Sequence, residues 1–219
     1  YQNEDSVYWG PVFEGVSDRL QQIGTDVITI TEPSGDTMFE VLNPAMISGI
    51  ITLGTISTQM LLDIRKLEIP VIMIDHYDPA FRCDTIFADN ITSMRELVTK
   101  LIAKGHKNMQ FVGNIKEAHS FFERWIAYRS VLEEYELFCN QCSSLLEVET
   151  SVEIEEAIEQ LDERDLPDVF VCANDFTAEF TIAGLRKRGL HVPDDCGVTG
   201  FDDTYVMDDP PLTTVAVDK

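Results

Sequence analysis

The sequence predicts an α/β protein made of two lobes, each built on a doubly wound parallel sheet. Two observations carry this prediction. Short runs rich in Val, Ile and Phe alternate with longer amphipathic segments, an order that is typical of strand–helix–strand units with right-handed crossovers. The apolar runs also show little alternation with polar residues, as expected for parallel strands that helices cover on both faces.

Seven apolar runs have the length and composition of strands. Most of them are bounded by Gly, Pro or Asp, which are common where strands end and turns begin. The runs cover residues 27–31, 49–53, 71–74, 85–88, 109–112, 169–173 and 196–201.

Six amphipathic segments lie before and between these runs, with apolar residues at helical spacing. The third one opens with Ser93-Met94-Arg95-Glu96, the pattern of a capping box, so this helix is expected to begin at Ser93 and to stop at Gly105. The other five are expected at about residues 12–23, 58–67 and 123–135, from Ser151 onward, and at about 177–188.

The predicted elements divide into an N-terminal lobe of residues 1–88 and a C-terminal lobe of residues 89–205. The remaining segment, 206–219, is expected to cross back toward the first lobe. The first predicted helix has no strand before it, and the sequence stops just after a strand-like run. We therefore expect the chain to be part of a longer protein.

The composition bounds the function classes. Hydrophobic residues make up 44% of the 219 residues, enough for a real core. With 39 acidic and 16 basic residues the formal net charge is −23, which argues against direct binding to nucleic-acid phosphates. The apolar runs are far too short to span a bilayer, and no signal peptide is visible. The odd number of cysteines does not suit a disulfide framework and indicates a reduced, cytoplasmic protein.

Signatures of metal sites and enzymes are weak. Cys139 and Cys142 have the CxxC spacing of redox sites and of half a zinc site, but no second Cys or His pair lies at a useful spacing. We therefore expect two incidental thiols. The GxSxG, P-loop, HExxH and GxGxxG motifs are absent. The sequence thus predicts no catalytic residue, no metal site and no cofactor.

Polar residues follow several predicted strands, and in parallel sheets such positions meet at one edge. Asp75, Asn174 and Asp202 are of this kind, and Tyr8 and Trp9, just before the first helix, are expected at the same edge. Carboxylates and amides bind hydroxyl groups, while aromatic faces stack on apolar ring surfaces. The set therefore suits a neutral polyhydroxylated ring, such as a sugar, or a planar base.

A second role is open to these positions, because Asp and Asn at the end of a strand often cap the next helix. We expect this role for Asp175 and Asp203. The helical pattern places Arg124 in the first turn of its helix, where the helix dipole disfavours a cation. Arg124 therefore needs a carboxylate, a phosphate or ligand hydroxyls as a partner, the alternative being a surface pair with Glu123.

Six short motifs follow one another in an order that matches a known family. The chain resembles the effector-binding domain of lactose/galactose-repressor (LacI/GalR) family transcription regulators over nearly its whole length. The motifs are Gly105-His106, Glu123-Arg124 with Tyr128-Arg129, Ala173-Asn174-Asp175, the segment 189–195, Gly200-Phe201-Asp202-Asp203 and the segment 210–215.

The resemblance implies a type I periplasmic-binding-protein-like fold, in which two α/β lobes close on a small effector, here a sugar or sugar derivative. Regulators of this kind work as homodimers. They bind operator DNA through an N-terminal helix-turn-helix, which this chain lacks, and effector binding controls operator binding allosterically. No membrane partner is implied.

The resemblance also implies effector contacts, position by position. Ala118 stands where a purine-responsive member would carry a basic residue, which favours a sugar over a purine. The implied effector-contacting residues are Tyr8, Trp9, Asp75, Asp89, Ser120, Arg124, Asn174 and Asp202.

Two other functions remain open at this point. An exported sugar-binding protein of a transport system would need a signal peptide and would tolerate unpaired cysteines poorly. A regulator controlled by a protein corepressor would carry a docking face on its first lobe and a pocket unable to bind sugars. Gly105-His106 and the segment 210–215 favour the regulator over the transport protein, and the corepressor alternative stays open.

Overall fold

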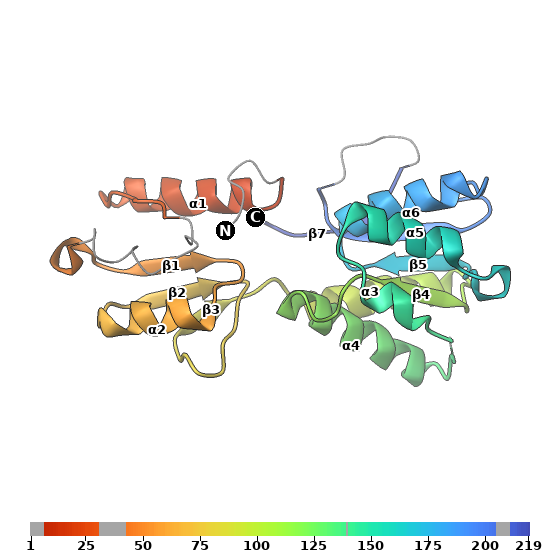
Figure 1. Ribbon diagram of the computed structural model, residues 1–219, viewed down its shortest axis with the longest axis horizontal. Coiled ribbons are helices and arrows are strands. Elements are labelled where there is room, and N and C mark those ends of the chain that lie inside the picture. The colour runs from red at the N-terminus through yellow and green to blue at the C-terminus, as the bar shows by residue number, and fades with distance from the viewer. Residues whose placement is uncertain (1–6, 31–42, 139, 205–210) are drawn as a thin grey trace. The chain divides into compact units, whose positions relative to one another are not determined.

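The computed structural model describes residues 7–30, 43–138, 140–204 and 211–219. The chain divides into two compact units, Tyr1–Ala88 together with Lys219, and Asp89–Asp218. Each unit contains one parallel sheet (Figure 1). No helix in the described ranges is long and apolar enough to cross a membrane. Cys139 of the CxxC pattern lies outside these ranges.

The first unit is built on three parallel strands in the order β1 (Ile50–Leu53), β2 (Val71–Ile74) and β3 (Asp84–Ile86). A short 3-10 turn, η2 (Pro44–Met46), precedes the sheet. One face of the sheet is covered by α2 (Thr58–Lys66), which begins after Ser57, whose hydroxyl accepts the backbone N–H of Met60. The buried core of this unit is Leu61, Ile64, Met73 and Phe81.

The first helix and the run after it differ from the sequence prediction. Helix α1 (Trp9–Gln22) begins three residues before the expected start at residue 12 and contains no buried residue. Residues 27–30 form no strand, and Thr31 of that predicted run lies outside the described residues. Ile28 and Ile30 are 74% and 39% exposed, and none of the strands in the described ranges pairs with this run. An apolar run forms a strand only where another strand can pair with it.

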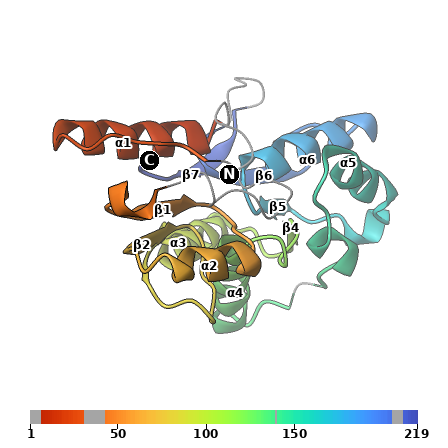
Figure 2. The same ribbon diagram turned by 60° about the vertical axis from the view of Figure 1, so that its left-hand side comes forward.

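The second unit is built on four parallel strands in the order β4 (Met109–Val112), β5 (Val169–Cys172), β6 (Gly197–Asp202) and β7 (Thr213–Ala216). Strand β7 lies at the edge beside β6 (Figure 2). The predicted crossover segment, 206–219, therefore contributes a strand to this sheet.

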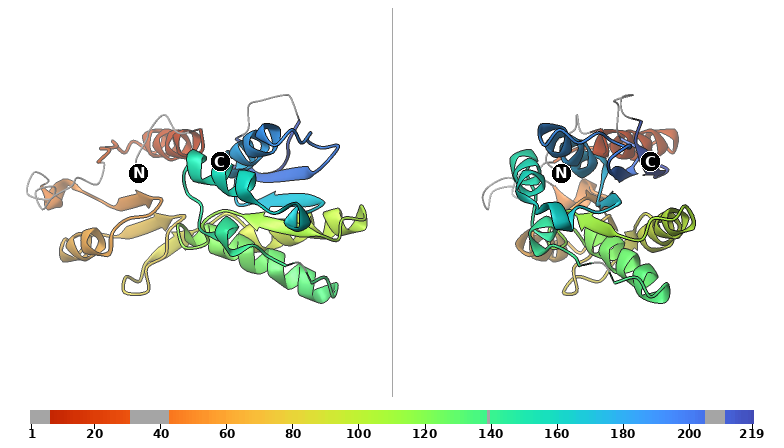
Figure 3. Two further views of the ribbon diagram at one scale, coloured as in Figure 1. Left: turned by 45° about the vertical axis from the view of Figure 1, so that its right-hand side comes forward. Right: turned by 90° about the vertical axis from the view of Figure 1, so that its right-hand side faces the viewer.

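Helices cover both faces of the second sheet, which makes it doubly wound. Helices α3 (Asn90–Ala103) and α4 (His119–Glu134) pack on one face against Phe111 and Val171. Helices α5 (Ser151–Gln160) and α6 (Asp175–Lys187) pack on the other against Phe170 and Cys172 (Figure 3). Successive residues of β5 thus point into two different apolar cores, which explains why the strand runs lack polar alternation.

A segment without strand geometry covers the outer edge of β4. The side-chain amide of Gln141 accepts the N–H of Phe111 and donates to its carbonyl, both at 2.9 Å. Gln110 binds this segment in return, accepting the N–H of Cys142 at 2.9 Å. The segment continues into η3 (Ser143–Leu146), where the Leu145 carbonyl accepts the N–H of Gly113. A further 3-10 turn, η4 (Glu163–Asp165), precedes β5.

Besides α1, three helices begin earlier than the sequence predicted, and in two of these three the capping residue explains why. Helix α3 starts at Asn90, because the Asp89 carboxylate accepts the N–H of Thr92, so the capping box expected at Ser93 is wrong. Helix α6 starts at Asp175 with Asn174 as its N-cap, so the cap role predicted for Asp175 is also wrong. Helix α4 starts at His119, which places Arg124 beyond the first turn.

Candidate functional site

A buried ion pair lies at the carboxyl edge of the second sheet. Nη2 of Arg124, from α4, lies 2.9 Å from Oδ1 of Asp202, the last residue of β6. The two side chains are only 2% and 10% exposed. The need of Arg124 for a partner was predicted correctly, but the first-turn argument for it was wrong. Its carboxylate partner is Asp202, and the surface pair with Glu123 is not formed.

Arg124 is held from several directions besides Asp202. Its Nε donates to Oδ1 of Asn90 at 2.9 Å, and its Nη1 donates to the carbonyl of Ala173 at 2.7 Å. The guanidinium carbon lies 3.7 Å from the centre of the Phe201 ring, in cation–π geometry. A guanidinium has five N–H donors. Three are used within the described residues, so two remain for another acceptor.

The backbone at the end of β6 brings Asp202 to this position. Asp202 and Asp203 both have positive φ angles, 99° and 52°, which are unfavourable for residues with a side chain. Gly200 allows the close approach of Asp175, since a Cβ at Gly200 would lie 2.0 Å from Asp175 Oδ1. Asp175 in turn accepts the hydroxyl of Thr214 in β7 and the N–H of Thr204. Local strain of this kind is typical of functional sites.

The carboxyl end of β4 adds a second polar group to this edge. Gly113 has φ 139°, and a Cβ there would lie 2.5 Å from Cβ of Ala173, so only glycine lets the ends of β4 and β5 approach. The next residue, Asn114, donates to the carboxylate of Glu149. Burial, with a smaller effect of the Glu149 charge, raises the pKa of the Glu117 carboxyl.

Other predicted site residues of the second unit take different positions. Ser120 is 4% exposed and lies one turn before Arg124 on the same face of α4. Asn174 accepts the N–H and hydroxyl of Thr177 through Oδ1, while its Nδ2 has no partner among the described residues. It therefore caps α6 and still has a donor to offer. Asp89 is exposed and caps α3.

Of the three predicted site residues of the first unit, Tyr8 and Trp9 contact each other. The Trp9 ring lies against Gly54, at the carboxyl end of β1, where a Cβ would be 3.0 Å from the ring. Tyr8 contacts the edge of Trp9, with ring centres 4.9 Å apart. Asp75 follows β2 with φ 54°, and its N–H donates to the Ile86 carbonyl.

Two residues of the site were missed by sequence reasoning. Asn90 is 1% exposed and connects Arg124 to Glu123, since its Nδ2 donates to Glu123 Oε2 at 2.9 Å. A buried amide at a helix start, one residue after a cap, has no distinctive pattern in a single sequence. Glu123 was considered only as a surface partner of Arg124.

Comparison with known proteins identifies the family. The periplasmic binding protein-like domain family matches residues 98–219. The HTH-type transcriptional regulator DegA of Bacillus subtilis is 29% identical over 95% of this chain, which spans 65% of DegA. This chain belongs to the periplasmic-binding-protein-like domains of LacI-family transcriptional regulators.

Solved structures of the transcriptional regulator CelR and of the Lac repressor share the fold. The complex of the transcriptional regulator CelR with cellobiose has a TM-score of 0.81 at 21% identity, covering 95% of this chain and 67% of CelR. The Lac repressor dimer bound to operator and an anti-inducer has a TM-score of 0.77 at 21% identity, covering 99% of this chain and 78% of the repressor chain. At this identity the likeness establishes the fold.

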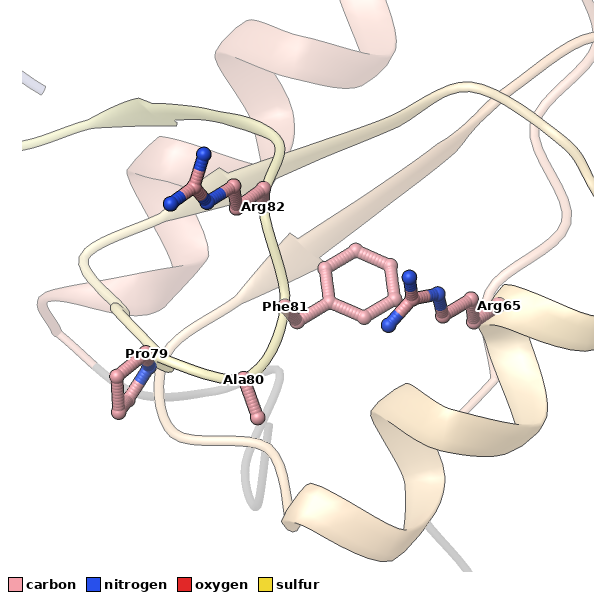
Figure 4. Close-up of a pocket in the computed structure, with 5 residues that line it drawn as sticks. All are labelled: Arg65, Pro79, Ala80, Phe81 and Arg82. Carbon is pink, nitrogen blue, oxygen red and sulfur yellow. The ribbon is translucent and has the colours of Figure 1, made fainter.

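A hollow in the first unit of this LacI-type domain is lined by none of the predicted site residues. Its volume is about 250 Å³, and it lies between the end of α2 and the connection from β2 to β3 (Figure 4). Its lining residues are Arg65, Pro79, Ala80, Phe81 and Arg82. None of the eight residues predicted to contact an effector is among them.

The described part of the LacI-type domain contains no group of three or more His, Cys, Asp or Glu side chains that could hold a metal ion. Four of the cysteines are described, and each is a free thiol. Cys172 and Cys196 are buried, and their burial raises the pKa of each thiol to about 12. They are small core residues in the second unit.

Proposed function

We propose that this domain senses a neutral sugar and that the sugar controls operator binding by the whole regulator. In the second unit, the effector contacts are Arg124, Asn174 and Asp202, with Ser120 and Asp89 nearby. Tyr8, Trp9 and Asp75 are the proposed contacts of the first unit. The whole protein is proposed to act in the cytoplasm as a homodimer, with operator DNA bound by a segment outside this chain.

The observation that carries the proposal is the buried Arg124–Asp202 pair. Two N–H groups of Arg124 and the Nδ2 of Asn174 can donate to hydroxyl oxygens, and Asp202 can accept from hydroxyl hydrogens. Because the charge of Arg124 is balanced by Asp202, the site offers no unmatched positive charge to a phosphate. A neutral polyhydroxylated ligand fits this balance better than a sugar phosphate does.

The relatives support the same class of ligand and role. The name of DegA is that of a transcriptional regulator, and the CelR structure contains cellobiose. The Lac repressor structure is a dimer on operator DNA, which supports the dimer and the DNA partner. The transporter and corepressor alternatives have no comparable support among these relatives.

The first experiment compares neutral sugars with their phosphates. We expect D-glucose, D-ribose or cellobiose to raise the melting temperature with concentration and to bind in calorimetry, whereas glucose 6-phosphate binds more weakly. Asp202→Asn keeps the shape but removes the charge, so it weakens neutral-sugar binding by about 1.5–3 kcal/mol, roughly one to two decades of affinity. The same variant should reduce the difference in affinity between the neutral sugar and the sugar phosphate, because the positive charge of Arg124 is then no longer balanced by a carboxylate.

Glu134→Gln is the matched control for Asp202→Asn. It makes the same change of charge in the exposed pair between Glu134 and Arg95, on the same helix as Arg124. This variant should bind as the wild type does. Tighter binding of sugar phosphates than of sugars by the wild-type domain would contradict the neutral-effector proposal.

The regulatory part of the proposal needs the full-length protein. We expect the sugar that binds the domain to change operator affinity by about 5–150-fold, the usual range of allosteric coupling. Fluorescence anisotropy of operator DNA measures this change, and sedimentation measures the dimer. Equal operator affinity with and without a bound sugar would leave the domain a sugar binder without a regulatory role.

A further inference from the structure

The buried amide of Asn90 connects two helices at the proposed effector site. Asn90 is the first residue of α3 and is 1% exposed. Its Oδ1 accepts Nε–H of Arg124, and its Nδ2 donates to Oε2 of Glu123, both at 2.9 Å. The other oxygen of Glu123 lies 3.3 Å from Nε2 of His119 at the start of α4. A chain of polar contacts therefore runs from the surface at His119 to the buried Asp202.

The chemistry of its two neighbours fixes the orientation of this amide. The Nε of arginine can only donate, and an ionised glutamate can only accept. A flipped amide would place a donor against Arg124 and an acceptor against Glu123, and both contacts would be lost. Glu123 thus holds the amide of Asn90 in one orientation, and Asn90 in that orientation accepts Nε–H of Arg124.

We infer that Asn90, locked by Glu123, is a positioning residue for Arg124. The guanidinium is planar, so a fixed Nε–H sets the plane in which all its other N–H groups lie. Asp202 and Ala173 bind Nη2 and Nη1 in that plane. The inference rests on the proposed function in one respect: the two remaining N–H groups, held in one direction, are those offered to the effector.

Substitutions at Asn90 and Glu123 can exchange the donor and the acceptor of the hydrogen bond between them. In Asn90→Asp a carboxylate still accepts from Arg124, but its second oxygen meets the Glu123 carboxylate, where like charges repel. Combining it with Glu123→Gln replaces that carboxylate by an amide that can donate to Asp. The double variant N90D/E123Q has the same net charge as the wild type, and its link to Arg124 is complete again.

The test measures hydrogen exchange at Nε–H of Arg124 by nitrogen-15 NMR in the effector-free domain. We expect Asn90→Ala to speed this exchange roughly tenfold or more, as for loss of a buried hydrogen bond to a charged group. N90D/E123Q should return it to within about threefold of the wild type, because the lost acceptor is restored. The Nε–H of Arg188, in the other helix layer, serves as an internal reference.

Arg95→Gln is the matched control. Arg95 also joins α3 to α4, through Ser130 and Glu134, but it does not contact Arg124. If the exchange at Arg124 reported only the packing of α3 on α4, Arg95→Gln would speed it as Asn90→Ala does. We expect Arg95→Gln to leave it unchanged.

Unchanged exchange at Arg124 in folded Asn90→Ala would overturn the inference. If Asn90→Ala does not fold, N90D/E123Q provides the test by itself. An exchange rate at Arg124 more than about ten times that of the wild type in this double variant would also overturn the inference. These measurements need no effector, so they stand even if no sugar binds. With a sugar that binds, Asn90→Ala should lower its affinity, and in an Arg124→Lys background it should add no further loss.

Discussion

The two units of this domain differ in how much apolar surface they bury. In the described part of the first unit, four apolar side chains form the core, and every residue of β3 is exposed. In the second unit, two separate apolar cores lie on the two faces of the sheet. The Arg124–Asp202 pair is built into the second unit, whose dense packing can hold a charged pair in one geometry.

The burial of matching strands makes the difference concrete. Every residue of β5 is buried, whereas β1 and β2 each bury one residue of four. Ile51 and Ile72, which are register partners in the first sheet, are each 37% exposed. The second sheet is therefore covered on both faces, and the first is covered chiefly on the face of α2.

The largest expected effect comes from removing an aromatic ring from the second core. Phe170→Ala should lower the free energy of unfolding of that unit by about 3–5 kcal/mol, because Phe170 is fully buried. Phe81→Ala, at 9% exposure in the thinner first core, should cost less. Trp9 lies in the first unit and Trp125 in the second. In a Trp9→Phe background the fluorescence of Trp125 reports urea unfolding of the second unit, and in a Trp125→Phe background that of Trp9 reports the first. Equal losses at the two sites would contradict the comparison.

A smaller effect is expected from adding one methyl group in each unit. Gly113→Ala drives a Cβ into Ala173, which is held in place because its N–H donates to the Val112 carbonyl, and should cost about 1–3 kcal/mol from overpacking. Gly54→Ala meets the Trp9 ring, at the start of a helix without buried residues, so the ring can move. It should lose only about 1 kcal/mol, from its positive φ. The same unfolding measurement checks both, and a larger loss for Gly54→Ala would reverse the ranking.

The smallest effect is a difference in thiol reactivity without any change of sequence. At pH 8 a thiol of pKa about 12, such as that of Cys172, is ionised in about one molecule in ten thousand. Burial raises the pKa of Cys83 in the first unit as well, but its side chain is only partly buried. We expect Ellman's reagent to label Cys83 in the native domain and Cys172 only after unfolding, with peptide mass spectrometry assigning the sites. Equal labelling rates would mean that the second core opens as readily as the first unit.

The sequence predicted most strands of both sheets, and it missed β7 of the second sheet. The runs at 109–112, 169–173 and 196–201 correspond to β4, β5 and β6 within one residue at each end, because strands buried on both faces are continuous apolar runs. The run at 27–31 had the same composition, but its described residues, 27–30, form no strand and pair with none of the described strands. Composition identifies a strand only when its partners are present.

The candidate site was predictable as a set of residues but not as a geometry. Arg124 and Asp202 were both singled out, yet nothing in the sequence pairs residues that lie 78 positions apart. Asn90 gave no signal, because its role depends on contacts with α4, which only the fold creates. Helix starts failed for a related reason, since several Asp, Asn and Ser residues compete to cap each helix.

At the edge of β4 the side-chain amide of Gln141 replaces the backbone of a neighbouring strand, because it accepts the N–H of Phe111 and donates to the Phe111 carbonyl. This makes the edge sensitive to chemical ageing. Deamidation to glutamate would replace the donor by a negatively charged oxygen facing the Phe111 carbonyl, and two acceptors cannot share a hydrogen bond. The covering segment would then be held by the bonds of Gln110 and Gly113, and a weaker cover favours pairing of the edge with another chain. One of the contacts that cover the edge of β4 thus depends on a single amide nitrogen that can be lost by hydrolysis.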